Sequence, residues 1–184
     1  MKNLFVLLAI FPFMVSCNGQ NDPNYKYSDQ ETEQFLNEIT KNAKVSITDI
    51  TEIKKQPTDE FGIITRCPLS KKEVDEYHKN HGTIVVKDDN IYDFASYILK
   101  DFELTNENNE KLQFIDNGRS KNLQGLPLGE YEKILYQNLG VVFKLNKKFE
   151  KLNGFIKIGF KMPNGMEKEI KIPVNITIND KIPE

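Results

Sequence analysis

The sequence predicts an α+β domain with a mainly antiparallel sheet, a C-terminal β-hairpin and three to four short packed helices. Three observations support this fold class. Two serine-led capping boxes mark helix starts, apolar residues follow the first of them at helical spacing, and two C-terminal segments alternate apolar and polar residues around a turn. A β-sandwich with helical insertions is the alternative.

The first helix is expected over residues 28–44. Ser28 and Glu31 have the spacing of a capping box, in which each side chain accepts a hydrogen bond from the other residue's backbone N–H. Three apolar residues then share one helix face: Phe35, Leu36 and Ile39. Strands are expected over residues 45–53 and 61–67.

A second, short helix is expected after Ser70, which forms a capping box with Glu73. Gly82 suits the left-handed residue that ends many helices. A strand over residues 83–86 and a helix over residues 89–98 should follow.

The middle of the chain is expected to hold a hairpin around an asparagine-rich turn. Pairing Phe102 with Phe114 and Leu104 with Leu112 keeps one face of that hairpin apolar. A helix over residues 130–139 is then expected.

The C-terminal hairpin has the clearest pattern. A two-residue turn would set Phe160 opposite Glu169 and bring charges against the core. A three-residue loop over residues 163–165 instead pairs Ile158 with Ile170. This loop also places Pro first and Gly at the left-handed position, as a type I turn with a glycine bulge requires. We therefore predict the three-residue loop.

The first 17 residues carry a targeting signal. Lys2 precedes an apolar run that is shorter than the roughly 20 residues a membrane span needs, but that suits a signal peptide. Met14-Val15-Ser16-Cys17 then resembles the lipobox of bacterial lipoprotein precursors. The resemblance implies that residues 1–16 are removed and that Cys17 carries a diacylglycerol, usually with a third acyl chain on the new amino terminus.

This resemblance predicts the organisation of the mature protein. Residues 17–27 read as a flexible tether and residues 28–184 as a single globular domain. Several acyl chains would hold the domain on a membrane stably. Asn18 stands where inner-membrane lipoproteins carry Asp, which favours the outer membrane, with the periplasmic face expected rather than the cell surface. Lipidation would leave Cys67 as the remaining thiol, expected to be buried.

Charge and motifs exclude several function classes. The formal net charge is −2, with Lys and Glu interspersed, so no nucleic-acid partner is expected. The sequence has no P-loop, dinucleotide fingerprint, nucleophile elbow or EF-hand loop, and no cofactor or catalytic residue is assigned. His78 and His81, with Asp75 one turn earlier, could form a partial zinc or nickel site. The simpler interpretation places both imidazoles favourably at a helix C-terminus.

The sequence thus predicts a lipid-anchored, non-enzymatic binding or interaction module of the bacterial envelope. It should contact the membrane through Cys17 and bind a protein partner. A narrower version is an immunity or inhibitor lipoprotein that acts against an envelope-acting toxin. The remaining alternative is a metal-binding or hydrolytic enzyme that uses His78 and His81.

Overall fold

The computed structural model describes residues 22–46, 57–80, 82, 90–115 and 121–178 of the 184-residue chain. The elements in this part of the chain are α1 (Asp29–Asn42), β1 (Lys44–Ser46), β2 (Thr58–Pro68), α2 (Lys71–Lys79), the 3-10 helix η1 (Ile91–Phe94), β3 (Ser96–Thr105), β4 (Lys121–Asn122), β5 (Gln124–Tyr131), β6 (Ile134–Phe149), β7 (Lys151–Lys161) and β8 (Glu167–Thr177).

The strands form two antiparallel sheets of four strands each, in the orders β1-β2-β6-β5 and β4-β3-β7-β8. The prediction of an α+β domain with three to four helices is therefore wrong. The described part of the chain is mainly β, with two α-helices and one 3-10 helix. It is closer to the alternative, a sandwich with helices inserted.

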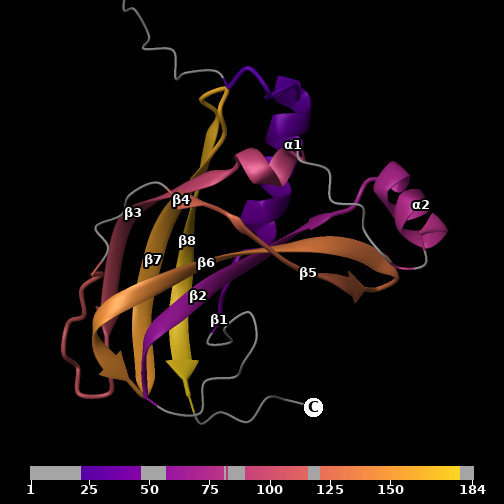
Figure 1. The fold of residues 1–184 in the computed structure, drawn as a ribbon. Coiled ribbons are helices and arrows are strands. Elements are labelled where there is room, and N and C mark those ends of the chain that lie inside the picture. The colour runs from indigo at the N-terminus through magenta and orange to yellow at the C-terminus, as the bar shows by residue number, and fades with distance from the viewer. Residues whose placement is uncertain (1–21, 47–56, 81, 83–89, 116–120, 179–184) are drawn as a thin grey trace, which may run out of the picture.

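The two sheets pack against each other around one hydrophobic core (Figure 1). Strands β2 and β6 cross in front of β7 and β8 in this view. Tyr97 of β3 meets Phe143 of β6 edge to face, with ring centroids 5.5 Å apart. Helix α1 contacts β2 of one sheet and β8 of the other, so it covers one side of the sandwich.

Both capping boxes are present. In α1 the Ser28 side chain accepts from the Glu31 N–H, and Ser70 does the same for Glu73 in α2. The apolar face of α1 is buried, as predicted. Helix α2 has no buried residue among those described, so its capping box is a main source of its local stability.

The helix predicted over residues 89–98 is wrong, because only η1 and then β3 occupy this segment. Leu99 and Phe102 lie three residues apart and both pack against the core. That spacing comes from a register shift between Leu99 and Asp101 in the pairing with β7, and not from a helical turn.

The helix predicted over residues 130–139 is also wrong, because β5 and β6 form a hairpin there. Glu132 and Lys133 make the turn with φ angles of 50° and 64°. Two left-handed residues are what a type I′ turn needs, and Asn-Gly usually supplies them. Glu-Lys gives no such signal, and the hairpin could not be predicted from it.

The C-terminal hairpin is confirmed in its predicted register. Ile158 pairs with Ile170, and Gly165 closes the three-residue loop with a φ of 85°. The middle hairpin is confirmed next to its turn, where the Leu112 N–H donates to the Leu104 carbonyl at 2.9 Å, and the Phe102 and Phe114 rings meet with centroids 4.5 Å apart. The described residues 112–115 nevertheless form no regular strand. The predicted strand over 83–86 and most of that over 45–53 lie outside the described residues.

The two sheets are joined by a sharp corner. Strand β6 ends at Phe149 and β7 begins at Lys151, so Glu150 alone connects them. The Glu107 carboxylate accepts from the Glu150 N–H at 3.0 Å and from the Lys151 N–H at 3.2 Å. This carboxylate therefore satisfies backbone donors that the bend removes from the sheets.

Candidate functional site

The structure describes only part of the predicted metal site, whose residues Asp75 and His78 lie one turn apart in α2. Asp75 and His78 are exposed on α2, and His81 lies outside the described residues. No group of three possible metal-ligating side chains occurs in the part of the chain that the structure describes. The metal hypothesis therefore gains no support.

The predicted lipidation site, Cys17, also lies outside the described residues. No described helix is both long enough and apolar enough to cross a membrane. The anchor thus stays a prediction from the sequence.

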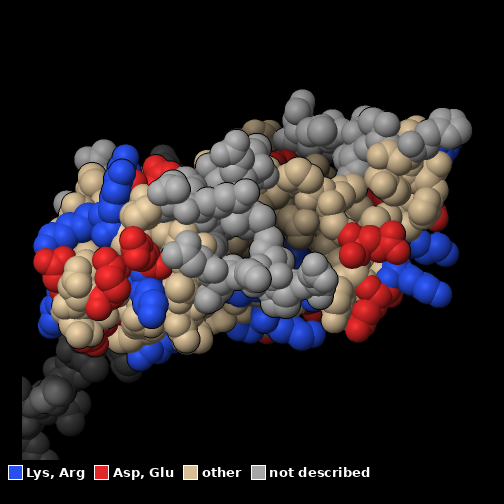
Figure 2. Space-filling view, turned by 90° about the horizontal axis from the view of Figure 1, so that it is seen from below, with Lys and Arg blue, Asp and Glu red and all other residues tan. Residues whose placement is uncertain are grey.

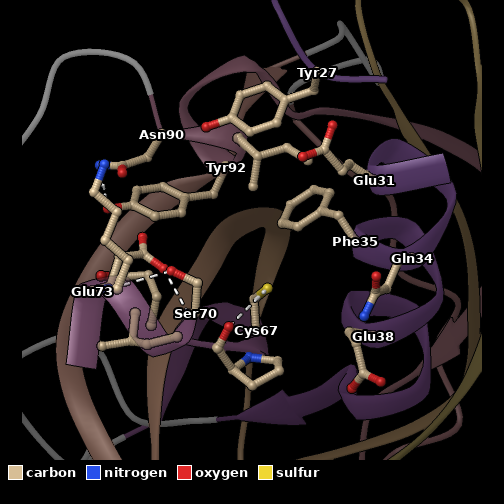
Figure 3. Close-up of a pocket in the computed structure, with 15 residues that line it drawn as sticks. Tyr27, Glu31, Gln34, Phe35, Glu38, Cys67, Ser70, Glu73, Asn90 and Tyr92 are labelled. Atoms are coloured by element: carbon tan, nitrogen blue, oxygen red, sulfur yellow. Dashed lines mark hydrogen bonds between the residues drawn. The ribbon is translucent and has the colours of Figure 1, made fainter. Parts of the chain in front are cut away.

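A pocket of about 580 Å³ lies where the end of β2 meets α1, the start of α2 and η1 (Figure 3). Phe35 of α1 and Ile91 of η1 contribute apolar side chains to its lining, and Tyr27 and Tyr92 contribute phenol rings. In Figure 3 the three labelled rings surround the pocket, with the Cys67 sulfur below them. Pockets of this size and mixed lining are typical of small-molecule sites.

The path of the chain after β2 explains how α2 reaches this pocket. The Leu69 N–H donates to the Leu135 carbonyl at 2.9 Å, and Ser70 then caps α2. The Glu73 carboxylate accepts from the Ser70 N–H at 2.7 Å. The capping box thus places this carboxylate on the pocket wall.

Cys67 is half-buried at the pocket wall, not fully buried as predicted. Removal from water raises the pKa of its thiol to about 12, and the nearby Glu73 and Glu38 carboxylates act in the same direction. No histidine is among the described lining residues, so no base stands ready to activate this thiol. Its environment is that of an unreactive cysteine.

We expect Cys67 to react slowly with iodoacetamide in the folded protein. Thiols react as thiolates, and raising a pKa from near 9 to about 12 lowers the thiolate fraction at pH 8 by about 1,000-fold. The measurement compares alkylation rates at pH 8 with and without 6 M guanidinium. Equal alkylation rates with and without guanidinium would contradict this environment.

The Cys67 thiol also affects the stability of the fold. The folded state binds the thiol proton more tightly than the unfolded state, so the free energy of unfolding should fall as pH rises from about 9 to 12.

A second candidate site is the outer face of the β1-β2-β6-β5 sheet. The Arg66 guanidinium of β2 lies over two phenol rings, those of Tyr131 and Tyr136, with its carbon 4.6 Å from each centroid. No carboxylate pairs with Arg66 among the described residues. We call Arg66, Tyr131 and Tyr136 the arginine–tyrosine cluster.

Apolar side chains extend this cluster over the same sheet face. Ile134 and Val142 of β6 are 46% and 41% exposed, and Tyr131 is 51% exposed. They are three of the four large hydrophobic residues exposed in the described structure. Alternation along β6 turns Ile134, Tyr136 and Val142 outward, while Leu139 and Val141 enter the core.

Charged residues elsewhere on the surface are mostly found in mixed-sign groups. Lysine and arginine side chains lie beside aspartates and glutamates on the face seen in Figure 2. Lys100 Nζ is 2.6 Å from the Glu167 carboxylate, and Lys147 Nζ is 2.9 Å from that of Glu110. Arg66 differs from these lysines, because its guanidinium lies over two aromatic rings and not beside a carboxylate of the described residues.

Sequence reasoning missed both candidate sites. Arg66 was expected on a strand, but its two tyrosines fell in the segment predicted to be a helix. The outward alternation of Ile134, Tyr136 and Asn138 was a usable signal for a strand. The pocket gave no such signal, because four separate segments form its wall.

Neither a protein-family model, nor a curated protein, nor a solved structure matches this chain.

Proposed function

We propose that this chain is a lipid-anchored, non-enzymatic interaction module of the bacterial envelope, and that the arginine–tyrosine cluster binds its protein partner. The observation that carries the proposal is a guanidinium held over two tyrosine rings, with no carboxylate partner among the described residues, on the sheet face that also exposes Ile134 and Val142. Tyrosine and arginine are the residue types that dominate binding energy in protein interfaces.

The cluster also indicates what the partner presents. Stacking on Tyr131 and Tyr136 restricts the Arg66 side chain before binding, which lowers the entropy lost on association. A planar guanidinium with free donors matches a carboxylate in a two-point hydrogen bond. The partner should therefore place an Asp or Glu at Arg66 and separate apolar side chains on Ile134 and on Val142, which are eight residues apart along β6.

The test is recovery of the partner from detergent-solubilised membranes with the full-length protein. We expect one stoichiometric protein to co-purify, and expect Arg66→Ala to lower its recovery at least about 10-fold, since a truncated hot spot costs about 2 kcal/mol or more. Lys144→Ala, on the same strand face but outside the cluster, is the control. Equal recovery with Arg66→Ala and wild type, at unchanged urea midpoints, would overturn the assignment of this face.

The anchor needs its own test. Labelled palmitate should enter the wild-type protein and not the Cys17→Ala variant. Label retained in that variant, or absent from the wild type, would contradict the proposed lipid anchor on Cys17. Neither result would bear on the proposed binding face. The immunity or inhibitor version further requires that the recovered partner is a toxin or hydrolase and loses activity in the complex.

A further inference from the structure

The pocket between α1, β2, α2 and η1 shares no residue with the arginine–tyrosine cluster. Its described lining holds three carboxylates, Glu31, Glu38 and Glu73, against one cation, Lys72. Those carboxylates come from two helices, so they approach the cavity from different sides. The cavity thus has a negative charge excess next to apolar walls.

Each carboxylate keeps one oxygen for a ligand. Glu31 and Glu73 use Oε2 to accept from the serines at their helix starts, and Glu38 uses Oε2 in a long contact of 3.4 Å with Asn42. Their Oε1 atoms have no hydrogen-bond partner among the described residues. The bonds from Ser28 hold the pKa of Glu31 below its ordinary value, so this group is charged at neutral pH.

Aromatic rings complete the pocket. Phe35 is buried against the core and shows its ring to the cavity, while Tyr27 and Tyr92 stand opposite it. Desolvation and the Asp93 and Glu73 carboxylates raise the pKa of Tyr92 to about 12, so its phenol is neutral. Neutral aromatic faces attract organic cations, and carboxylates strengthen that attraction.

We propose that this pocket binds a small organic cation, a primary ammonium carried on an apolar body, with the ammonium attracted by the Glu31 and Glu73 carboxylates on either side of the cavity and the body against Phe35, Tyr92 and Ile91. A primary ammonium has three donors, which suits several acceptor oxygens better than a quaternary ammonium with none. The cavity of about 580 Å³ has room for such a molecule and lies within the usual range for ligand pockets.

Three related probes test the charge requirement on the full-length protein: 2-phenylethylamine, 2-phenylethanol and phenylacetate. They share a phenyl ring and differ in carrying a positive, neutral or negative head. Titrations followed by methyl NMR should show saturable shifts at Leu69 and Ile91, which line the pocket, and none at the distant Ile115. The pocket should bind 2-phenylethylamine with a Kd of about 1 mM, an ordinary affinity for a ligand of this size.

Conservative variants test which residues hold the ammonium. Gln can replace Glu in a capping box, so Glu31→Gln and Glu73→Gln remove charge and keep both helix starts. The double variant should weaken 2-phenylethylamine binding about 3- to 10-fold, because Glu31 is exposed and Glu73 half-buried, and such ion pairs each contribute about 0.2–1 kcal/mol. Glu33→Gln, exposed on α1 and not among the lining residues, should leave the Kd within about twofold.

The outcomes separate clearly. Amine binding that exceeds alcohol and acid binding, and that falls in the double variant, supports the proposal. Equal binding of amine and alcohol, tighter binding of phenylacetate, or no saturable shift at Leu69 and Ile91 overturns it. The comparison of probes uses wild-type protein alone, so it holds even where a variant is unstable. None of these results depends on the protein partner of the outer sheet face.

Discussion

Gly154→Ala should lower the free energy of unfolding by about 3–5 kcal/mol. Gly154 lies in β7, the strand between β3 and β8, and has a φ of 133°. A methyl group at this position would overlap the Glu103 carbonyl oxygen and would lie 3.2 Å from the Leu104 Cα. Both obstacles are backbone atoms, so relief requires the two strands to move apart. Urea unfolding measures the loss.

Gly165→Ala is the matched control, because it makes the same substitution at another left-handed residue. Gly165 has a φ of 85° in the β7–β8 loop, and a methyl group there would meet no atom within 4 Å. Its cost should be the conformational strain alone, about 1–2 kcal/mol. Equal losses for the two variants would show that the close approach of β3 to Gly154 is not the cause.

Ile158→Ala should lower stability by about 3 kcal/mol and the Tm by about 6–12 °C. Ile158 is fully buried in β7, where Leu99 of β3 and Ile170 of β8 lie opposite it. Removing three carbon atoms there loses burial and leaves a cavity, because neighbouring strands on both sides restrict collapse. Calorimetry of the variant and the wild type checks both values.

Ile115→Ala removes the same atoms from a residue that is 57% exposed. Its effect should stay within about 0.5 kcal/mol, as for most surface substitutions. If Ile115→Ala lowered the free energy of unfolding as much as Ile158→Ala, Ile115 would not be exposed in solution.

Local chemistry explains the parts of the fold that could be predicted. A capping box acts within four residues, so Ser28 and Ser70 predict their helix starts without knowledge of the rest of the chain. The register of the C-terminal hairpin follows from parity, since the wrong loop length would turn Glu169 and Lys171 inward. Both signals are contained in short stretches of sequence.

The wrong predictions share a non-local cause. Residues 96–98 belong to a strand and not to the predicted helix, because β7 pairs with them about 60 residues later in the chain. The β5–β6 turn uses Glu132 and Lys133 in a conformation that neither residue favours. The fold class followed these errors, since one expected helix is a β-hairpin and another is a short 3-10 helix followed by a strand.

The candidate sites were hidden for the same reason. Arg66 and Tyr131 are far apart in sequence and meet only because β6 pairs with both β2 and β5. Cys67 was expected to be buried on the apolar side of its strand, and that side proved to be a pocket wall. Single-strand patterns predict which way a side chain points, but not whether its neighbours fill the space.

The corner at Glu150 has a consequence for how this domain comes apart. It links β6 and β7, the inner strands of the two sheets, through one residue. Because a single residue joins the two sheets, neither sheet should separate from the core without the other. Both sheets should therefore exchange their amide hydrogens as one cooperative unit, at the free energy of global unfolding. Among the described elements, local openings are instead expected at α2 and η1, which bury no residue of their own. Among the described elements, a protease should therefore reach these two short helices before it reaches either sheet.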